Sequence, residues 1–431
     1  MTEPTNGQPT SPEPSPTTTG PVGGWGRFTV AAYGPTTLAS VGHGAVTPLV
    51  ALSALDLGAS LEMSALVIGL SAIGQLIGDL PASWIATRLG EKRAIIAACL
   101  WDAVFLLLAF SATTLPLLCL AVFCFGPAGA VFGLARQNYL TEAVPSYLRA
   151  RALSTLGGAY RMGVFLGPLA GAAIIGYWNL AAAYAFAAGM SVLAALVTLA
   201  LPDLPGERVR GQSRIPAEAR LWHVLRTHYR VLLTLGTGTT MLALTRAVRQ
   251  AILPLWCESI GLSPSATSLI YAVSMAVDMS LFFVGGWIMD RFGRLWVALP
   301  SMIVLGIGLM SLAAANRPAL VIVVAIVLGL GNGVGSGVIM TLGSDASPSI
   351  GRPQFLSGWR LMTDAGNTAG PLAISALVAL TTSLAVATVT LGGVACLGAI
   401  WLGYGIRHNP PPPRSLGQTS PASPQSPVSP Q

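Results

Sequence analysis

Stretches of about twenty apolar residues recur along most of the chain, and they constrain its fold more than any other feature. A helix of that length spans the ~30 Å hydrocarbon core of a membrane. Charged residues make up 9% of the chain, whereas a soluble domain contains about 25%. The sequence therefore predicts an all-α integral membrane protein with twelve membrane-spanning helices. The predicted spans are 28–54, 63–86, 94–113, 116–138, 154–177, 180–201, 229–256, 266–289, 296–314, 318–341, 356–380 and 384–406.

The apolar region consists of two parts that match each other at a fixed offset of 203 residues. One ungapped offset that holds over about ninety residues indicates an internal repeat. We therefore expect two pseudo-symmetric six-helix halves, 25–201 and 229–406, joined by a cytoplasmic linker at 202–228. The clearest matches are Glu142 with Asp345, Arg149 with Arg352, and Gly163-x-x-x-Gly167-Pro168 with Gly366-x-x-x-Gly370-Pro371.

Both ends of the chain, 1–24 and 407–431, are rich in proline, serine and threonine, and we expect them to be disordered cytoplasmic tails. The five cysteines lack metal or disulfide spacing. The only lysine, Lys92, lies outside any phosphate-binding Gly-x-x-x-x-Gly-Lys loop. We expect no catalytic residues, no metal site, no cofactor and no ATP-driven transport, and so no enzyme.

Basic residues are distributed unequally between the loops that the twelve spans predict. Nearly all of them fall on one side of the membrane, and the opposite side has only Arg317. Positively charged loops remain in the cytoplasm, so we expect a multi-pass protein of the plasma (inner) membrane with both termini cytoplasmic. The net charge of +7 follows from this topology and indicates no nucleic-acid partner. We expect a monomer in the lipid bilayer with a small-molecule substrate.

One acid and two arginines stand in a short turn after the eighth span, in the sequence Gly286-Trp287-Ile288-Met289-Asp290-Arg291-Phe292-Gly293-Arg294. A weaker copy lies 203 residues upstream; it keeps Arg88, Gly90 and Arg93, but Thr87 replaces the acid. The pattern Gly-x-x-x-Asp-Arg-x-Gly-Arg resembles the loop signature of the major facilitator superfamily. The resemblance implies a secondary transporter that works by alternating access. We expect Asp290 to pair with Arg149 or Arg151 at a cytoplasmic gate.

A glycine run in the fifth span, with Gly163, Gly167, Pro168 and Gly171, resembles the antiporter motif of the drug-efflux branch of this family. The copy of this run in the eleventh span supports another interpretation. Small residues allow close packing of membrane helices, so the run can be a packing seam without any relation to export. Both interpretations remain open at this point.

Charges inside predicted spans are costly in lipid and therefore mark candidate functional residues. Arg161 and Asp278 each lie twelve residues from a cytoplasmic loop, which is about 18 Å at ~1.5 Å per residue. The resemblance places helices 5 and 8 in contact, so we expect this pair to form an ion pair. By the same reasoning we expect Asp79 to face Arg360. The repeat relates Arg161 to Asp364 and Asp278 to Gln75, so we expect Asp364 to face Gln75.

Asp364 is the candidate proton carrier, because its expected partner is neutral, and His43 is its rival. We expect Asp102, on an outer helix, to serve packing. The resemblance implies that the cavity helices carry His43, Arg136, Arg246 and Arg249. This basic cavity favours a neutral or anionic substrate, although Arg246 and Arg249 can instead extend to the outer surface.

The sequence thus favours proton-coupled export of a small, drug-like, neutral or anionic organic molecule. One alternative is an importer or facilitator of a metabolite or organic anion. Another is a transporter-like receptor or assembly factor that moves nothing.

Overall fold

The structure, a computed structural model, describes residues 25–144, 148–201, 221–348 and 350–409. Most of both tails and of the expected linker therefore lies outside the described residues. Every regular element of the described chain is helical, which confirms the expected all-α class. The first group of helices is α1 (Trp25–Val46), α2 (Leu49–Asp56), α3 (Leu61–Leu89), α4 (Glu91–Phe110), α5 (Leu115–Ala143), α6 (Arg149–Tyr177) and α7 (Ala182–Leu199).

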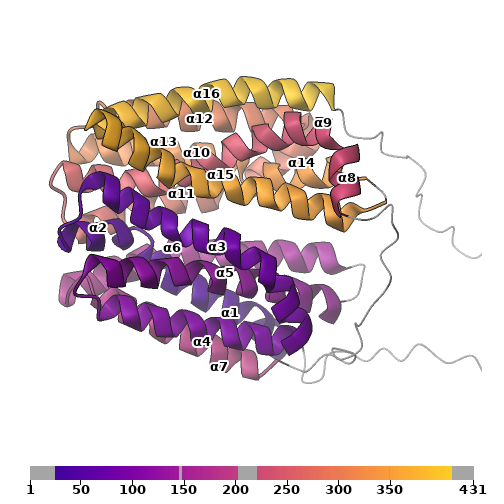
Figure 1. Cartoon of the computed structure of the whole chain (residues 1–431), viewed down its shortest axis with the longest axis horizontal. Helices are drawn as coiled ribbons and strands as arrows, with labels where there is room; N and C mark the ends of the chain where they lie inside the picture. Colours follow the sequence, from indigo (N-terminus) through magenta and orange to yellow (C-terminus); the bar gives the residue numbers. More distant parts are fainter. Residues whose placement is uncertain (1–24, 145–147, 202–220, 349, 410–431) are drawn as a thin grey trace, which may run out of the picture.

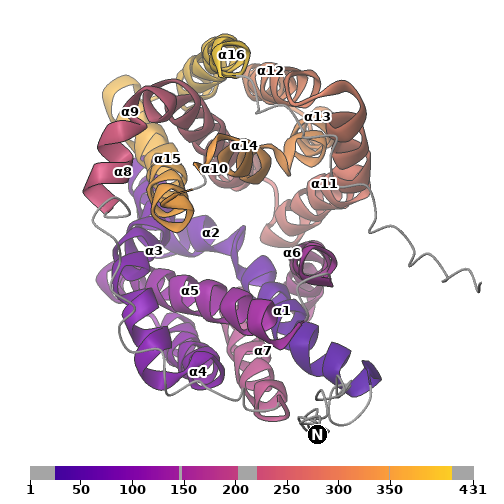
Figure 2. The same cartoon turned by 90° about the vertical axis from the view of Figure 1, so that its right-hand side faces the viewer.

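The second group begins with two short helices, of which the first, α8, lies within the expected linker 202–228. It consists of α8 (Leu221–Thr227), α9 (Tyr229–Val231), η3 (Leu232–Gly236), α10 (Thr237–Ser259), α11 (Pro264–Phe292), α12 (Leu295–Leu312), α13 (Pro318–Gly335), α14 (Val338–Ala346), α15 (Arg352–Thr381) and α16 (Leu384–His408). Figure 1 shows the long helices of both groups running side by side along the longest axis. The groups meet mainly where α3 packs on α15 and α6 packs on α11, as the end view in Figure 2 also shows.

Eleven helical segments of the described chain are long and apolar enough to cross a membrane. The other expected span, 356–380, lies within α15. This helix has 30 residues and is long enough at ~1.5 Å per residue, but it is not among these eleven, and its span carries Arg360 and Asp364. Both are charges that the sequence marks as functional.

The 203-residue repeat is visible in the geometry of the backbone. Helices α3 and α11 both have 29 residues, and their first and last residues are 203 positions apart. Gly58 and Gly261 have φ angles of 84° and 78°, and Gly90 and Gly293 have 82° and 97°. Such positive φ values favour glycine at a helix end. The matching turns indicate that the two groups of helices share one architecture.

The glycines of the 163–171 run pack α6 tightly against α1. A Cβ atom on Gly167 would lie 2.5 Å from the carbonyl oxygen of Val41 and 2.6 Å from the amide nitrogen of Ala45. The equivalent Gly370 packs α15 against α10, where a Cβ atom would lie 2.7 Å from that of Ala247. The same helix pair is therefore in close contact in both groups, and packing explains these glycines without reference to the direction of transport.

We expect Gly167→Ala to destabilise the protein, because the added methyl group overlaps backbone atoms of α1. Overpacking of this kind costs about 1–3 kcal/mol, and it should lower the melting temperature of the detergent-purified protein. Gly157→Ala is the matched control on α6, since nothing lies within 4 Å of its Cβ position. Alanine is the better helix former, so this variant should melt at the wild-type temperature or above. Equal melting temperatures of the two variants would rule out tight packing of α6 against α1 at Gly167.

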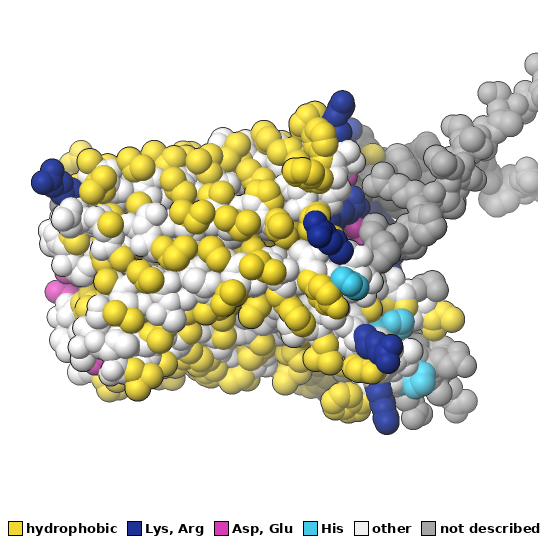
Figure 3. All heavy atoms as spheres, turned by 90° about the horizontal axis from the view of Figure 1, so that it is seen from above, with side chains coloured by type: hydrophobic (Ala, Val, Ile, Leu, Met, Phe, Trp, Pro, Cys, Tyr) yellow, Lys and Arg dark blue, Asp and Glu magenta, His cyan; other side chains and the backbone are white. Residues whose placement is uncertain are grey.

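Most of the basic side chains in Figure 3 gather at the right-hand end of the molecule. Arg88, Arg291 and Arg407 lie in the last turns of their helices at this end, whereas Arg317 precedes α13 at the other end. The long sides of the molecule carry mostly hydrophobic side chains in this view. A hydrophobic flank between polar ends is the surface that a bilayer requires.

Candidate functional site: the cavity between the helix groups

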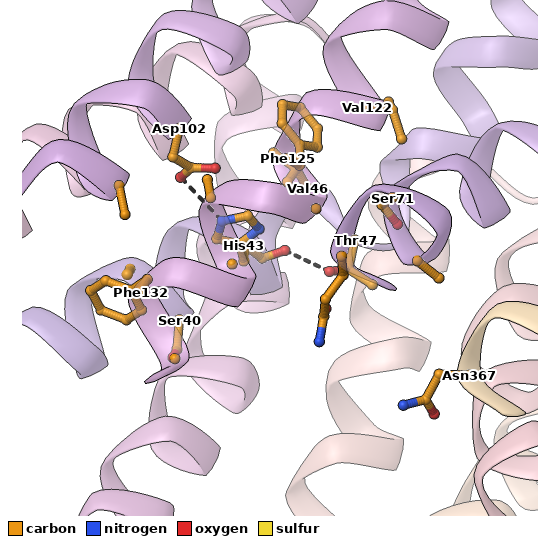
Figure 4. A pocket seen from close by; sticks show the side chains of 18 of the residues that line it. Ser40, His43, Val46, Thr47, Ser71, Asp102, Val122, Phe125, Phe132 and Asn367 are labelled. Carbon is orange, nitrogen blue, oxygen red and sulfur yellow. Dashed lines mark hydrogen bonds and ion pairs between the residues drawn. The ribbon is translucent and has the colours of Figure 1, made fainter. Parts of the chain in front are cut away.

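A cavity of about 570 Å³ lies where the two groups of helices meet (Figure 4). Its walls are formed mainly by α1, α3, α4 and α5 of the first group and are completed by α10 and α15 of the second. His43, Arg136 and Gln75 line it, as expected for His43 and Arg136. This volume is in the usual range for a pocket that holds a drug-sized ligand.

His43 on α1 forms a polar cluster with Asp102 of α4 and Ser191 of α7 at the cavity wall. Its Nε2 lies 3.1 Å from Oδ2 of Asp102 (Figure 4), and the Ser191 hydroxyl donates a 2.6 Å hydrogen bond to the same oxygen. The expectation that Asp102 lies far from the cavity is wrong, because Asp102 lines it. The physical reason is the rotation of α4, which turns Asp102 toward His43 of α1 and Ser191 of α7.

Arg136 on α5 extends into the cavity between two aromatic rings. Its guanidinium carbon lies 5.3 Å from the ring centre of Phe132 and 5.7 Å from that of Tyr160. Its Nε is buried without a hydrogen-bond partner. No carboxylate in the described residues forms an ion pair with it.

Arg246 and Arg249 do not line this cavity, contrary to expectation, and neither extends to the outer surface. Arg249 is 2% exposed, and its guanidinium donates to Ser274 Oγ over 2.9 Å. Arg246 donates to the carbonyl oxygen of Gly335 over 2.5 Å. The guanidinium groups of both arginines reach α11 or α13, whereas Ala247 and Gln250 of the same helix line the cavity. The sequence gives the helix and the depth of each residue, but not the rotation of the helix about its axis.

The expected ion pair between α6 and α11 is present. Arg161 donates to Asp278 Oδ1 over 2.8 Å, in a contact between the two groups of helices. Asp278 also accepts a 2.5 Å hydrogen bond from Asn332, and Arg249 lies 3.6 Å from it. Asp278 is therefore the centre of a buried network, and sequence reasoning identified only one of its three partners.

The expected contact between Asp79 and Arg360 is also present, and it joins α3 to α15. Arg360 donates to Asp79 Oδ1 over 2.9 Å, and its Nε lies 3.4 Å from Asp364 Oδ2. Oδ2 of Asp79 is buried without a hydrogen-bond partner in the described chain. We call Asp79, Arg360 and Asp364 the shared-arginine cluster.

The expectation that Asp364 faces Gln75 is wrong for the described structure. Asn367 donates to Asp364 Oδ1 over 3.4 Å, and no hydrogen bond joins Asp364 to Gln75 within the described residues. The reason is that Arg360 lies one turn before Asp364 on the same face of α15. Its guanidinium can therefore reach Asp364 and Asp79 together.

The loops that are expected to be cytoplasmic form contacts within their own helix groups. Asp290 is exposed and forms no ion pair in the described chain, so the expected pairing with Arg149 or Arg151 is absent. Arg149 donates to the Val144 carbonyl over 3.4 Å, while Arg93 and Arg151 are exposed. The strong contact is instead Arg294 with Asp345, at 2.7 Å. The 203-residue offset singles out Asp345, but it gives no sign of its partner.

The other signature arginines stack on aromatic rings of their own helices. Arg88 lies 4.8 Å from the ring centre of Trp84, and Arg291 lies 5.7 Å from that of Trp287. Gly90 and Gly293 supply the positive φ angles that end α3 and α11. The signature thus fixes the shape of two equivalent turns.

Comparison with known proteins agrees with this architecture. The family model described as Major Facilitator Superfamily matches residues 36–247 and 235–430. The multidrug resistance protein MdtH of Yersinia pestis (strain Pestoides F) is 25% identical over 346 residues, which cover 77% of this chain and 82% of that protein. The same values hold for MdtH of Yersinia pseudotuberculosis serotype O:1b (strain IP 31758).

Two solved structures share the fold at low sequence identity. A crystal structure of a point mutant of the nucleoside transporter NupG has a TM-score of 0.74 at 15% identity and covers 88% of this chain and 99% of its own. A crystal structure of a point mutant of the peptide transporter POT, in complex with sulfate, has a TM-score of 0.70 at 14% identity. The match covers 89% of this chain and 95% of that chain. These relatives and fold neighbours are transporters rather than enzymes. The match of the family model to nearly the whole helical region shows that this chain belongs to the major facilitator superfamily.

Proposed function

We propose that this protein is a proton-coupled secondary transporter that exports a small, neutral or anionic organic molecule by alternating access. The observation that carries this proposal is the shared-arginine cluster. It connects an acid on one group of helices to an arginine and an acid on the other, beside a cavity of drug-like size. The contact between Arg360 and Asp79 must break or shift whenever the two groups of helices move relative to each other.

A proton on the cluster would change its electrostatics. With both carboxylates charged, two negative groups face the single guanidinium of Arg360. Protonation of Asp364 leaves one anion for one cation, so Asp79 and Arg360 can form an ordinary pair. Proton binding can in this way favour one arrangement of the two helix groups, and proton release can favour the other. Coupling requires this difference in the proton's affinity for the two arrangements. His43 with Asp102 is the second candidate proton site.

The proposed topology has twelve membrane helices, with α15 as the eleventh in chain order. The halves are 25–201 and 229–406, with tails 1–24 and 407–431 and the linker 202–228 in the cytoplasm. The repeated helix bounds and the basic residues at one end support this arrangement. We propose that the protein is a monomer in the plasma membrane, that a proton is its coupling ion, and that no cofactor takes part.

The name of the MdtH relatives supports export of a drug-like molecule, at 25% identity. Import or facilitated passage of an organic anion is the second candidate, because Arg136 in the cavity has no ion-pair partner in the described chain and favours an anion in either direction of transport. A receptor that transports nothing is the third. Direction and coupling therefore need a flux measurement.

Proteoliposomes can separate these functions with two probes, neutral chloramphenicol and anionic 2-naphthoate. An acidic lumen should drive accumulation of at least one probe, and a protonophore should abolish it. Weak acids enter alkaline compartments passively, so accumulation of naphthoate in an acidic lumen requires a carrier. Empty liposomes are the control. Flux that only equilibrates the probe would indicate a facilitator, accumulation in an alkaline lumen beyond the control would indicate symport, and no flux of either probe would contradict the proposal.

A further inference from the structure

We propose that Arg136 binds the anionic group of an aromatic substrate, so that the cavity accepts aromatic carboxylates in preference to neutral or cationic analogues. This inference rests on the proposed function, because it names the substrate class of the same cavity. It assigns recognition to one side chain on α5 and to the two rings beside it.

The first observation is the unsatisfied state of the guanidinium. Arg136 lines the cavity, its Nε is buried, and it donates no hydrogen bond within the described residues. A buried polar group without a partner is costly. Other arginines inside the helix bundle have carboxylate partners: Arg161 and Arg249 contact Asp278, and Arg360 contacts Asp79. Arg136 is thus the cavity arginine that lacks a counter-ion in the described chain.

The second observation is the electrostatic surroundings of this side chain. No carboxylate in the described residues lies within ion-pair distance of Arg136, and Tyr160 packs beside its guanidinium. Asp102 is the acid that lines the same cavity, and it is engaged by His43 and Ser191. A positive charge that the protein does not balance favours an anionic ligand, and a planar guanidinium binds a carboxylate through two parallel hydrogen bonds.

The third observation is the apolar and aromatic wall beside the charge. Phe132 and Tyr160 flank the guanidinium, and Phe125 and Val122 line the wall farther along the cavity (Figure 4). Aromatic rings pack favourably against other aromatic rings in offset or edge-on arrangements. A cavity of about 570 Å³ has room for a fused ring system. A charge at one point and rings around it match an aromatic carboxylate.

Titration calorimetry on the full-length protein in detergent tests this inference with three probes of one shape: 2-naphthoate, 2-naphthamide and 2-naphthylmethylamine. We expect naphthoate to bind at least about tenfold more tightly than the other two. Arg136→Gln should weaken naphthoate binding about tenfold or more, since loss of a buried charged partner costs several kcal/mol and about 1.4 kcal/mol is tenfold. Arg317→Gln, at an exposed arginine outside the cavity, should bind as the wild type does.

Three results would overturn the inference: equal binding of naphthoate and naphthamide, tighter binding of the amine, or unchanged naphthoate affinity in Arg136→Gln. The comparison of probes on the wild type decides the question even if Arg136→Gln does not fold. Arg136→Lys then serves as the second variant; it keeps the charge but loses the planar fork, and its affinity should be intermediate. The assay has no proton gradient and no flux, so it can fail while export stands, and the flux assay can fail while this site stands.

Discussion

Replacing Asp364 with asparagine should abolish proton-driven accumulation of substrate and leave substrate exchange across the membrane. Asparagine resembles the protonated acid in shape and charge, so the shared-arginine cluster would remain in its one-anion state throughout the cycle. Exchange needs no net proton movement and therefore continues. In proteoliposomes, accumulation in an acidic lumen should fall to the level reached without a gradient, while exchange of internal for external probe keeps about its wild-type rate.

The matched control for this variant is His43→Ala, which removes the other candidate proton site. If the carrier is Asp364, His43→Ala still accumulates substrate against its gradient. The reverse result, with accumulation by Asp364→Asn and none by His43→Ala, would assign coupling to the His43–Asp102 pair and refute our proposal. Asn367→Ala tests whether the weaker neighbour of Asp364 matters, and we expect it to retain accumulation.

Removing Asp278 should destabilise the protein far more than removing Arg161. Asp278→Ala leaves Arg161, Arg249 and Asn332 without their common partner, and an uncompensated buried charge costs about 3–5 kcal/mol. Arg161→Ala leaves Asp278 in contact with Arg249 and Asn332, so its cost should be clearly smaller. Thermal unfolding of the purified variants measures both effects, and the yield of folded protein is a second readout.

The network around Asp278 also determines the expected result of a charge swap between Arg161 and Asp278. A simple pair would tolerate Arg161→Asp combined with Asp278→Arg. Here the new arginine side chain in α11 would lie beside Arg249, so the double variant should remain unstable. Recovery of wild-type stability by the swap, or equal melting of Asp278→Ala and Arg161→Ala, would show that Arg249 and Asn332 contribute little to this network.

Residues that the sequence placed correctly were those whose depth and helix were both known. Counting along the chain gives depth at ~1.5 Å per residue, and the family resemblance gave the neighbouring helices. Together they were sufficient for Arg161 with Asp278 and for Asp79 with Arg360. The all-helical class followed from the apolar runs, and family membership followed from the loop signature and the repeat.

The errors have one physical origin, the rotation of each helix about its own axis. A helix surrounded by lipid and by other apolar helices carries little polar periodicity, so its sequence does not indicate which face turns inward. Asp102 was therefore assigned to packing although it lines the cavity. Arg249 was assigned to the cavity although it faces Asp278, and Gln75 was assigned to Asp364 although Arg360 takes that position.

The glycine contacts of α6 with α1 and of α15 with α10 have a mechanical consequence. Backbones in direct contact leave no flexible side chains between them, so the two helices of each pair should move together as one rigid unit. With 29 and 30 residues, α6 and α15 extend about 45 Å at ~1.5 Å per residue. Arg161 lies part-way along α6 and Arg360 part-way along α15, and each contacts a helix of the other group. Tilting either helix about such a contact moves its two ends in opposite directions. The opening of the cavity at one end of the bundle then narrows as the opening at the other end widens.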